Sequence, residues 1–109
     1  MLPKKYRLPA KDFRNVYSKG IKLRGQYGML VATPSQSLRI GFVINKKIGN
    51  AIQRHRMTRL LRASFLELVK ELNIEKKLMD LEYVAFEFCS IKDTLKTELG
   101  KQIKQACSL

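Results

Sequence analysis

The chain has 109 residues, of which 45% are hydrophobic, and it carries a formal net charge of +13. The length fits one compact domain, residues 1–109, and the apolar content is too high for a disordered tail. So strong a positive charge points to a polyanionic partner.

The positive charge is concentrated in the first part of the chain. Residues 1–62 contain 15 Lys and Arg but only one acid, Asp12, whereas residues 63–109 contain 7 Lys and Arg against 8 acids. A chain made basic only for solubility would spread its cations along its length. The asymmetry therefore predicts a single binding surface.

Several classes of protein are excluded by what the sequence lacks. The two cysteines, Cys89 and Cys107, are too few for a disulfide framework, and with a single His55 they form no zinc set. We expect two buried thiols in a reducing compartment. No apolar run approaches the ~18 residues of a membrane span, and the N-terminus lacks the apolar core of a secretory signal. We expect a cytoplasmic protein with no metal site and no small-molecule cofactor.

The first part of the chain predicts an arm, a helix and two strands. Residues 1–9 form a basic, proline-containing arm that we expect to be extended and mobile. Residues 11–19 form a short helix that Gly20 ends in a left-handed conformation. Residues 21–33 form a strand interrupted at Gly25 and Gly28, and residues 38–45 form another. The turn at residues 34–37 predicts a hairpin between them.

The second part predicts a long helix, a strand and a last helix. Asn50 is the expected cap of the long helix, whose apolar stripe repeats at helical spacing through Met57, Leu61, Phe65, Leu68 and Leu72. Residues 81–89 alternate as a strand, and Ser90 is the expected cap of a helix with its apolar edge at Ile91, Leu95, Leu99 and Ile103. The order αβββαβα predicts an α+β or α/β two-layer sandwich with a mixed sheet.

The start of the long helix is the main candidate for a binding site. At ~100° per residue, His55, Arg56, Arg59 and Arg62 lie on the side opposite the apolar stripe. Arg54 lies in the first turn, and Lys46 and Lys47 precede it. Arginine donates two hydrogen bonds to phosphate, and a helix N-terminus adds free N–H groups. These residues predict a site for several phosphates.

No catalytic constellation accompanies this site. Gly49-Asn50 lacks the spacing of a P-loop, and no nucleophile–base set or carboxylate pair is present. His55 lies among arginines without an orienting carboxylate, so we interpret it as a binding residue. Phe13 and Tyr17, one helical turn apart, fit either a core position or a platform on which unpaired bases stack.

At KKIGNAIQRHRMTRLLR the sequence resembles the protein component of bacterial ribonuclease P. The segments LPAKDFRNVYSKG and LRIGFVINKK also resemble that family. The resemblance implies a sandwich with an unusual left-handed βαβ crossover. It also implies a protein subunit that helps a catalytic RNA remove the 5′ leader of precursor tRNA. The partners would be ribonuclease P RNA and the single-stranded leader, and the Mg²⁺ would be held by RNA phosphates.

The resemblance also assigns residues to two surfaces. The surface expected to face the RNA comprises Lys46, Lys47, Asn50, Arg54, Arg56, Arg59 and Arg62, together with His55. The cleft expected to receive the leader comprises Phe13, Tyr17, Tyr27, Met29, Val31 and Arg62.

Some positions depart from the family pattern. His55 replaces an Asn, Thr58 replaces a Lys, and Asn45 replaces a common Ser. Phe86-Glu87 stands where the family commonly has an Arg, which weakens any RNA contact expected from that strand. Two other functions remain open: a structural ribosomal or general RNA-binding protein, and, last, a stand-alone nuclease, for which the basic half offers only Asp12 as a metal ligand.

Overall fold

The computed structural model describes residues 2–108 and confirms the predicted α+β order. The helices and strands are α1 (Phe13–Lys19), β1 (Ile21–Arg24), β2 (Gly28–Pro34), β3 (Arg39–Val43), α2 (Ala51–Glu71), β4 (Met79–Ala85) and α3 (Lys92–Cys107). Short 3-10 turns, η1 (Lys4–Tyr6), η2 (Ala10–Asp12) and η3 (Lys46–Ile48), precede α1 and α2.

The four strands form one mixed sheet in the order β1-β2-β4-β3. β1 and β4 both pair antiparallel with β2, and β3 pairs parallel with β4, so β3, α2 and β4 form the parallel crossover that the resemblance implies. The predicted hairpin between the strands on either side of residues 34–37 is therefore wrong. β4 lies between those two strands. Its residues are largely buried on both faces, and a central position in the sheet removes the most apolar surface from water.

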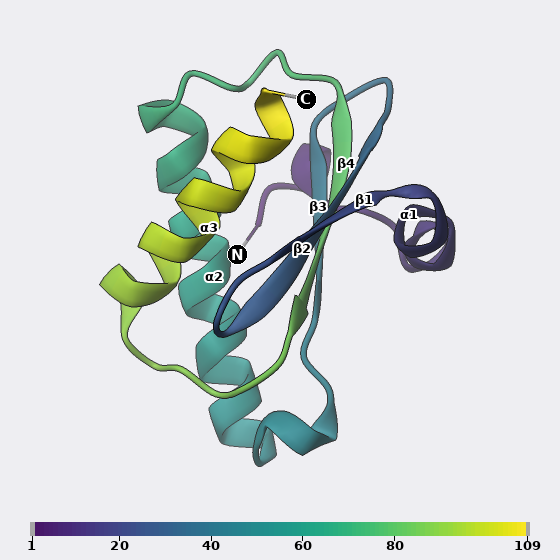
Figure 1. Cartoon of the computed structure of the whole chain (residues 1–109). Helices are drawn as coiled ribbons and strands as arrows, with labels where there is room; N and C mark the ends of the chain where they lie inside the picture. The colour runs from purple at the N-terminus through teal and green to yellow at the C-terminus, as the bar shows by residue number, and fades with distance from the viewer. Residues whose placement is uncertain (1, 109) are drawn as a thin grey trace.

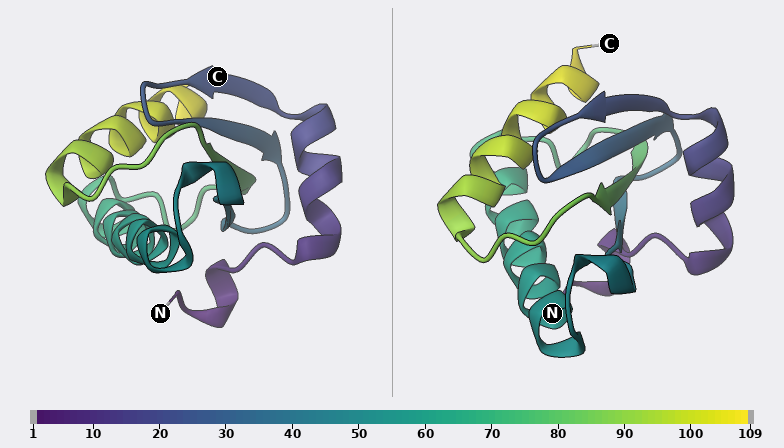
Figure 2. Two further views of the ribbon diagram at one scale, coloured as in Figure 1. Left: turned by 90° about the horizontal axis from the view of Figure 1, so that it is seen from below. Right: turned by 60° about the horizontal axis from the view of Figure 1, so that its bottom comes forward.

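Helices cover the two faces of the sheet unequally. Figures 1 and 2 show α2 and α3 on one face and α1 alone on the other. The larger apolar cluster lies between the sheet and the α2–α3 pair. A smaller cluster of Leu8, Val16, Met29 and Val31 lies under α1. The short α1 leaves part of its face uncovered, and this is the face on which a cleft can form.

The predicted apolar stripe fixes α2 to the sheet. Met57, Leu61 and Phe65 have no exposed surface, Leu68 is buried, and Leu72 at the end of the stripe is half-buried. Burying each of these side chains fully contributes about 1.5–3 kcal/mol. The stripe therefore fixes which side of α2 faces solvent.

The N-terminal segment is packed, in contrast to the extended, mobile arm predicted from its charge. Leu2 and Leu8 are buried, and the Leu8 N–H donates to the Ile40 carbonyl at 3.0 Å. Arg7 Nε donates to the Leu2 carbonyl at 2.9 Å. The two leucines supply apolar surface, and the edge strand β3 supplies free backbone groups, so the segment docks despite its lysines.

Two predicted helix ends also differ. Gly20 has an extended backbone with φ −77°. A larger residue does not fit at this position, because an added Cβ would lie 2.4 Å from Val31 Cγ1. Ile91, and not Ser90, occupies the cap position of α3, and no side chain caps that helix. The helix therefore begins at Lys92, one turn ahead of the buried Leu95.

Both cysteines are free thiols, but only one of them is buried as expected. Cys89 is a buried free thiol, whereas Cys107 is free but only half-buried near the end of α3. Burial raises the pKa of the Cys107 thiol. No helix within residues 2–108 combines the length and the apolar character needed to cross a membrane.

We predict that Leu61→Ala lowers the free energy of unfolding by about 2–5 kcal/mol, because it opens a cavity beneath α2. Ile52→Ala on the same helix is the matched control: Ile52 is 82% exposed, and its truncation should change stability by less than about 0.5 kcal/mol. Urea unfolding followed by circular dichroism measures both. Equal losses in the two variants would contradict the packing described here.

Candidate nucleic-acid interface

The loop before α2 is fixed by two side-chain caps. Asn45 Oδ1 accepts from the Lys47 N–H at 3.0 Å, which closes the η3 turn. Asn50 Oδ1 accepts from the Gln53 N–H at 2.8 Å, and Gln53 Oε1 accepts from the Asn50 N–H at 3.0 Å. This capping box confirms Asn50 as the helix cap. The box occupies the Asn50 side-chain oxygen, which leaves only its amide N–H groups for a ligand.

We call the cationic residues of η3 and the first half of α2 the basic ridge. Its members are Lys46, Lys47, Arg54, His55, Arg56, Arg59 and Arg62. Lys46, Lys47, His55, Arg56 and Arg59 are exposed, and Arg54 and Arg62 are half-buried. Arg54 folds back, and its Nε donates to the Gly49 carbonyl at 3.1 Å. The structure thus brings the predicted RNA-facing residues together on η3 and the first half of α2.

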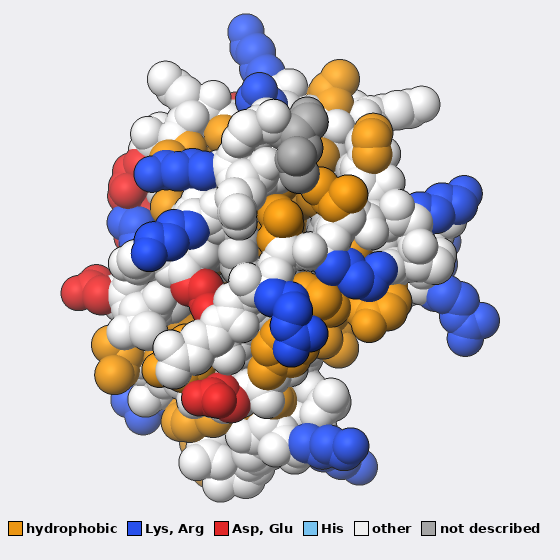
Figure 3. Space-filling model, viewed as in Figure 1, with side chains coloured by type: hydrophobic (Ala, Val, Ile, Leu, Met, Phe, Trp, Pro, Cys, Tyr) orange, Lys and Arg blue, Asp and Glu red, His pale blue; other side chains and the backbone are white. Residues whose placement is uncertain are grey.

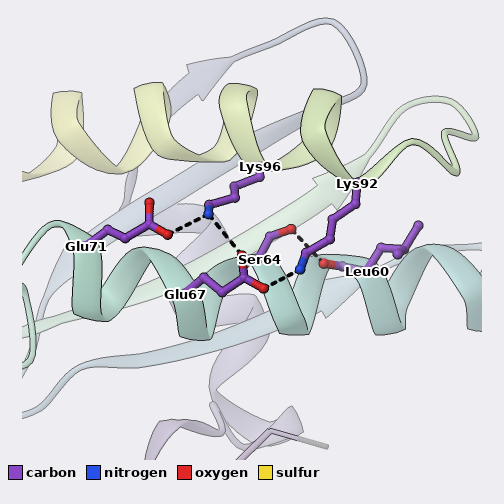
Figure 4. Close-up of polar contacts among 6 residues, drawn as sticks. All are labelled: Leu60, Ser64, Glu67, Glu71, Lys92 and Lys96. Atoms are coloured by element: carbon purple, nitrogen blue, oxygen red, sulfur yellow. Dashed lines mark hydrogen bonds and ion pairs between the residues drawn. The ribbon is translucent and has the colours of Figure 1, made fainter.

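The cations of the basic ridge are not neutralised by carboxylates within residues 2–108. Asp12, the one acid of the first 62 residues, lies 3.7 Å from Arg39, which also forms a two-bonded pair with Asp80 at 2.8 and 2.9 Å. The nearest acids on α2 are used elsewhere, because Glu67 pairs with Lys92 and Lys96, and Glu71 pairs with Lys96 (Figure 4). The lysines of α3 lower the pKa of Glu67 through these hydrogen bonds.

A hollow of about 510 Å³ lies along the ridge, lined by Arg56, Arg59, Leu60, Arg62, Ala63 and Lys92. Each arginine can present its planar fork to a phosphate, and the hollow is wide enough for more than one phosphate oxygen to approach. Lys92 comes from α3 and extends the lining beyond α2, while its ammonium group pairs with Glu67. Sequence reasoning missed Lys92, because nothing in the local sequence places it beside Arg62.

A second hollow, of about 370 Å³, joins the ridge to α1. We call it the Phe13 cleft; its lining residues are Leu2, Arg7, Leu8, Phe13, Ile40, Gly41, Phe42, Thr58 and Arg62. The Phe13 ring lies directly over Gly41, where an added Cβ would come within 2.4 Å of ring atoms. The hydroxyl of Thr58 donates to the Arg54 carbonyl at 2.8 Å, so it is already used within the helix. A half-buried aromatic ring and the Arg62 guanidinium thus share one concave surface.

The predicted leader-contacting residues do not all reach this cleft. Phe13 and Arg62 line it, and Tyr17, one turn along α1, is 44% exposed. Val31 is fully buried and Met29 is 5% exposed, because α1 covers both. Tyr27 packs against the larger cluster on the opposite face, and its N–H donates to Glu98 of α3 at 3.1 and 3.2 Å. Met29 and Val31 therefore pack beneath α1 together with Phe13, and Tyr27 lies outside the cleft.

One acid lies under α1. Glu82 pairs across the sheet with Val31 on one side and Gly41 on the other, and it is only 4% exposed. Within residues 2–108 no group bonds to its Oε1 atom. Burial raises the pKa of Glu82, and the charge of Lys22 acts in the opposite direction. Glu82 forms no ion pair with a cation of the basic ridge within residues 2–108.

The described residues, 2–108, offer no set of side-chain ligands for a metal ion. Among residues 2–108, no three His, Cys, Asp or Glu side chains gather closely enough to hold a metal ion. The carboxylates nearest the ridge form ion pairs with arginine or lysine. What the ridge and the cleft can offer chemically is hydrogen bonding to anions and contact with flat apolar groups.

These features define a small α+β protein with one cationic face beside an aromatic cleft. The family model described as Ribonuclease P matches residues 2–107, so the chain belongs to the Ribonuclease P family.

Three comparisons show how far the similarity extends. The chain is 41% identical over 64 residues to a ribonuclease P protein component from Nitratiruptor sp., a match that spans 59% of each chain. It is 30% identical over 113 residues to one from Listeria monocytogenes, and that match spans 95% of each. The RNase P protein from Thermotoga maritima has the same fold, with a TM-score of 0.74 at 20% identity, over 91% of this chain and 96% of that one. The first of these matches spans less than two thirds of the relative.

We predict that Glu82→Gln stabilises the fold more at pH 7 than at pH 4. The pKa of Glu82 is raised in the folded protein, so the folded state binds the proton more tightly than the unfolded state, whose pKa is about 4.3. Stability is then lost as the pH rises from the unfolded pKa through the folded one. Glutamine has no charge to bury, so the variant should escape this loss.

Urea unfolding at a series of pH values measures this effect. Glu87→Gln is the matched control, because Glu87 is an exposed carboxyl just beyond the same strand. Parallel pH profiles for wild type and Glu82→Gln would show that Glu82 does not carry the effect.

Proposed function

We propose that this chain is the protein subunit of ribonuclease P, which assists a catalytic RNA in removing the 5′ leader of precursor tRNA. The observation that carries the proposal is the basic ridge, whose cations have no carboxylate partners within residues 2–108 and which adjoins an aromatic cleft. The family to which the chain belongs supports it.

In this proposal the basic ridge binds the ribonuclease P RNA. Arg56, Arg59 and Arg62 lie along one hollow and are free to donate paired hydrogen bonds to phosphates. The apolar stripe behind them holds α2 in place, so little order has to be gained on binding. Contacts of this kind give affinity without sequence specificity and depend strongly on salt.

The Phe13 cleft receives the single-stranded leader. A leader has unpaired bases that can lie on an aromatic ring, and its phosphates require cations nearby. Phe13 and Arg62 supply one of each within a single hollow. Because Arg62 lines both hollows, a leader that leaves the catalytic RNA can enter the cleft directly.

Catalysis belongs to the RNA in this proposal, and the Mg²⁺ ions are held by RNA phosphates. The chain contributes the cations of the basic ridge. Cationic side chains placed against phosphates reduce the repulsion that metal ions would otherwise have to screen, so the protein lowers the Mg²⁺ concentration that the reaction needs. We place the protein in the cytoplasm with its tRNA substrates.

The alternative function is that of a general or ribosomal RNA-binding protein, because such a protein would also have the basic ridge. It would bury its aromatic residues in the core, whereas Tyr17 is 44% exposed and Phe13 is half-buried beside Arg62. The exposed rings favour a protein that also holds unpaired nucleotides.

We predict that Arg56→Ala/Arg59→Ala weakens binding to ribonuclease P RNA by about tenfold or more, because charge-assisted hydrogen bonds contribute about 1.5–3 kcal/mol each. The slope of log affinity against log salt should fall by about two. Precursor tRNA cleavage should fail at low Mg²⁺ and recover at high Mg²⁺. Filter binding and single-turnover cleavage measure these effects.

The matched control is Lys101→Ala/Lys104→Ala, which removes the same charge from exposed positions on α3. It should preserve cleavage at low Mg²⁺. If the wild-type chain does not stimulate a bacterial ribonuclease P RNA at low Mg²⁺, the proposed function is wrong. If both double variants lose the same affinity, net charge and not the ridge explains the binding.

A further inference from the structure

A cation lies on each of two exposed aromatic rings on the same face of the sheet as α1. Lys22 Nζ lies 4.7 Å from the centroid of the Tyr17 ring, and Arg24 Cζ lies 4.7 Å from the centroid of the Phe86 ring. Tyr17 is 44% exposed and Phe86 is 37% exposed. In Figure 3, Lys and Arg side chains lie against an apolar patch in the middle of the visible face, where Figure 1 places β1.

The two pairs are arranged in a row along the edge strand β1. Lys22 pairs with Val31 and Arg24 pairs with Met29, and both partners pack under α1. Opposite residues in an antiparallel pair point to the same face, so Lys22 and Arg24 both project on the α1 side. They are two residues apart in a strand, which is about 6.6 Å. That spacing suits successive nucleotides of an extended single strand.

The Arg24–Phe86 pair is held by the backbone around it. The Phe86 N–H donates to the Tyr27 carbonyl at 2.7 Å, and Tyr27 is bound in turn by Glu98. The Gly25 N–H donates to the Gly28 carbonyl at 2.8 Å, and an added Cβ at Gly25 would lie 2.2 Å from Glu98. The tip of the β1–β2 hairpin is thus locked to α3, and the ring is placed before any ligand binds.

The cations of the row are available to a polyanion. Neither Lys22 nor Arg24 forms an ion pair with a carboxylate in the range 2–108. Lys22 Nζ donates to the Tyr17 carbonyl at 2.7 Å, which holds the ammonium group beside the ring and leaves it able to donate further. The planar guanidinium of an arginine can itself serve as a surface on which a base stacks.

The row lies at the opposite end of α1 from the Phe13 cleft. Phe13 lies over Gly41 of β3, one edge of the sheet, and Tyr17 meets Lys22 of β1, the other edge. These edges are separated by three interstrand spacings, about 14 Å. At about 6.6 Å per nucleotide, a strand that enters beside Arg62 and follows α1 reaches β1 after about two further nucleotides.

We propose that Tyr17, Lys22, Arg24 and Phe86 form a second stacking platform, which binds the nucleotides of the single-stranded leader that lie beyond the Phe13 cleft. The proposal rests on the proposed function, because the ridge fixes the side from which the leader enters. Phe86 stands where the family commonly has an Arg. In this chain Arg24 of β1 supplies the cation, and Phe86 supplies the apolar surface beneath it.

The test compares precursor tRNAs with a short leader, which ends within the Phe13 cleft, and a long leader, which crosses the sheet. Phe86→Leu and Arg24→Gln should each weaken holoenzyme binding of the long-leader substrate roughly fivefold to a hundredfold, the range expected for loss of one stacked base. Binding of the short-leader substrate should be unchanged. Phe86→Tyr, which keeps the ring, should behave as wild type, and Lys101→Gln controls for the lost charge.

A second assay separates this proposal from the proposed function. The free chain is titrated with fluorescent oligouridine, which needs no catalytic RNA. Phe86→Leu should weaken this binding and Phe86→Tyr should retain it, even if the wild-type chain does not stimulate a ribonuclease P RNA. The platform is excluded if the Phe86→Leu chain binds oligouridine as wild type does. It is also excluded if short-leader and long-leader substrates lose equal affinity.

Discussion

The packing of the α2 apolar stripe against the sheet is the interaction on which the rest of the structure depends. Met57, Leu61 and Phe65 are fully buried, and they fix the rotation of the helix about its own axis. Once that rotation is fixed, Arg56 and Arg59 have to face solvent, because they lie on the other side of a regular helix. The cationic surface is therefore a consequence of the core, and the capping box at Asn50 fixes where it begins.

The carboxylates are distributed so that they stabilise the fold without neutralising the cationic face. Asp80 and Asp12 hold Arg39 and so join the start of α1 to the sheet. Glu67 and Glu71 join α2 to α3 through Lys92 and Lys96 (Figure 4). These pairs are partly exposed and contribute modestly to stability. Their larger effect is that they occupy the acids nearest to the ridge.

Local patterns in the sequence predicted the helices, the strands and the basic ridge. The features that the sequence did not predict depend on contacts between residues far apart in the chain. The stripe and cap of α2 follow from spacing within a few residues. The insertion of β4 between β2 and β3 depends on a strand some 40 residues further along the chain, which no local pattern records. The resemblance assigned Met29 and Val31 to the leader cleft, but it does not show that α1 covers both side chains. Arg24 and Phe86 come together only in the folded sheet.

Chemical footprinting of arginine residues, read by mass spectrometry, tests the central claim most directly. The chain is labelled with an arginine-specific reagent, alone and bound to a ribonuclease P RNA, and its lysines are labelled in parallel. The account predicts that Arg56 and Arg59 lose reactivity in the complex, while Lys101 and Lys104 on the outer side of α3 keep theirs. Full reactivity of Arg56 and Arg59 in the bound state would contradict it.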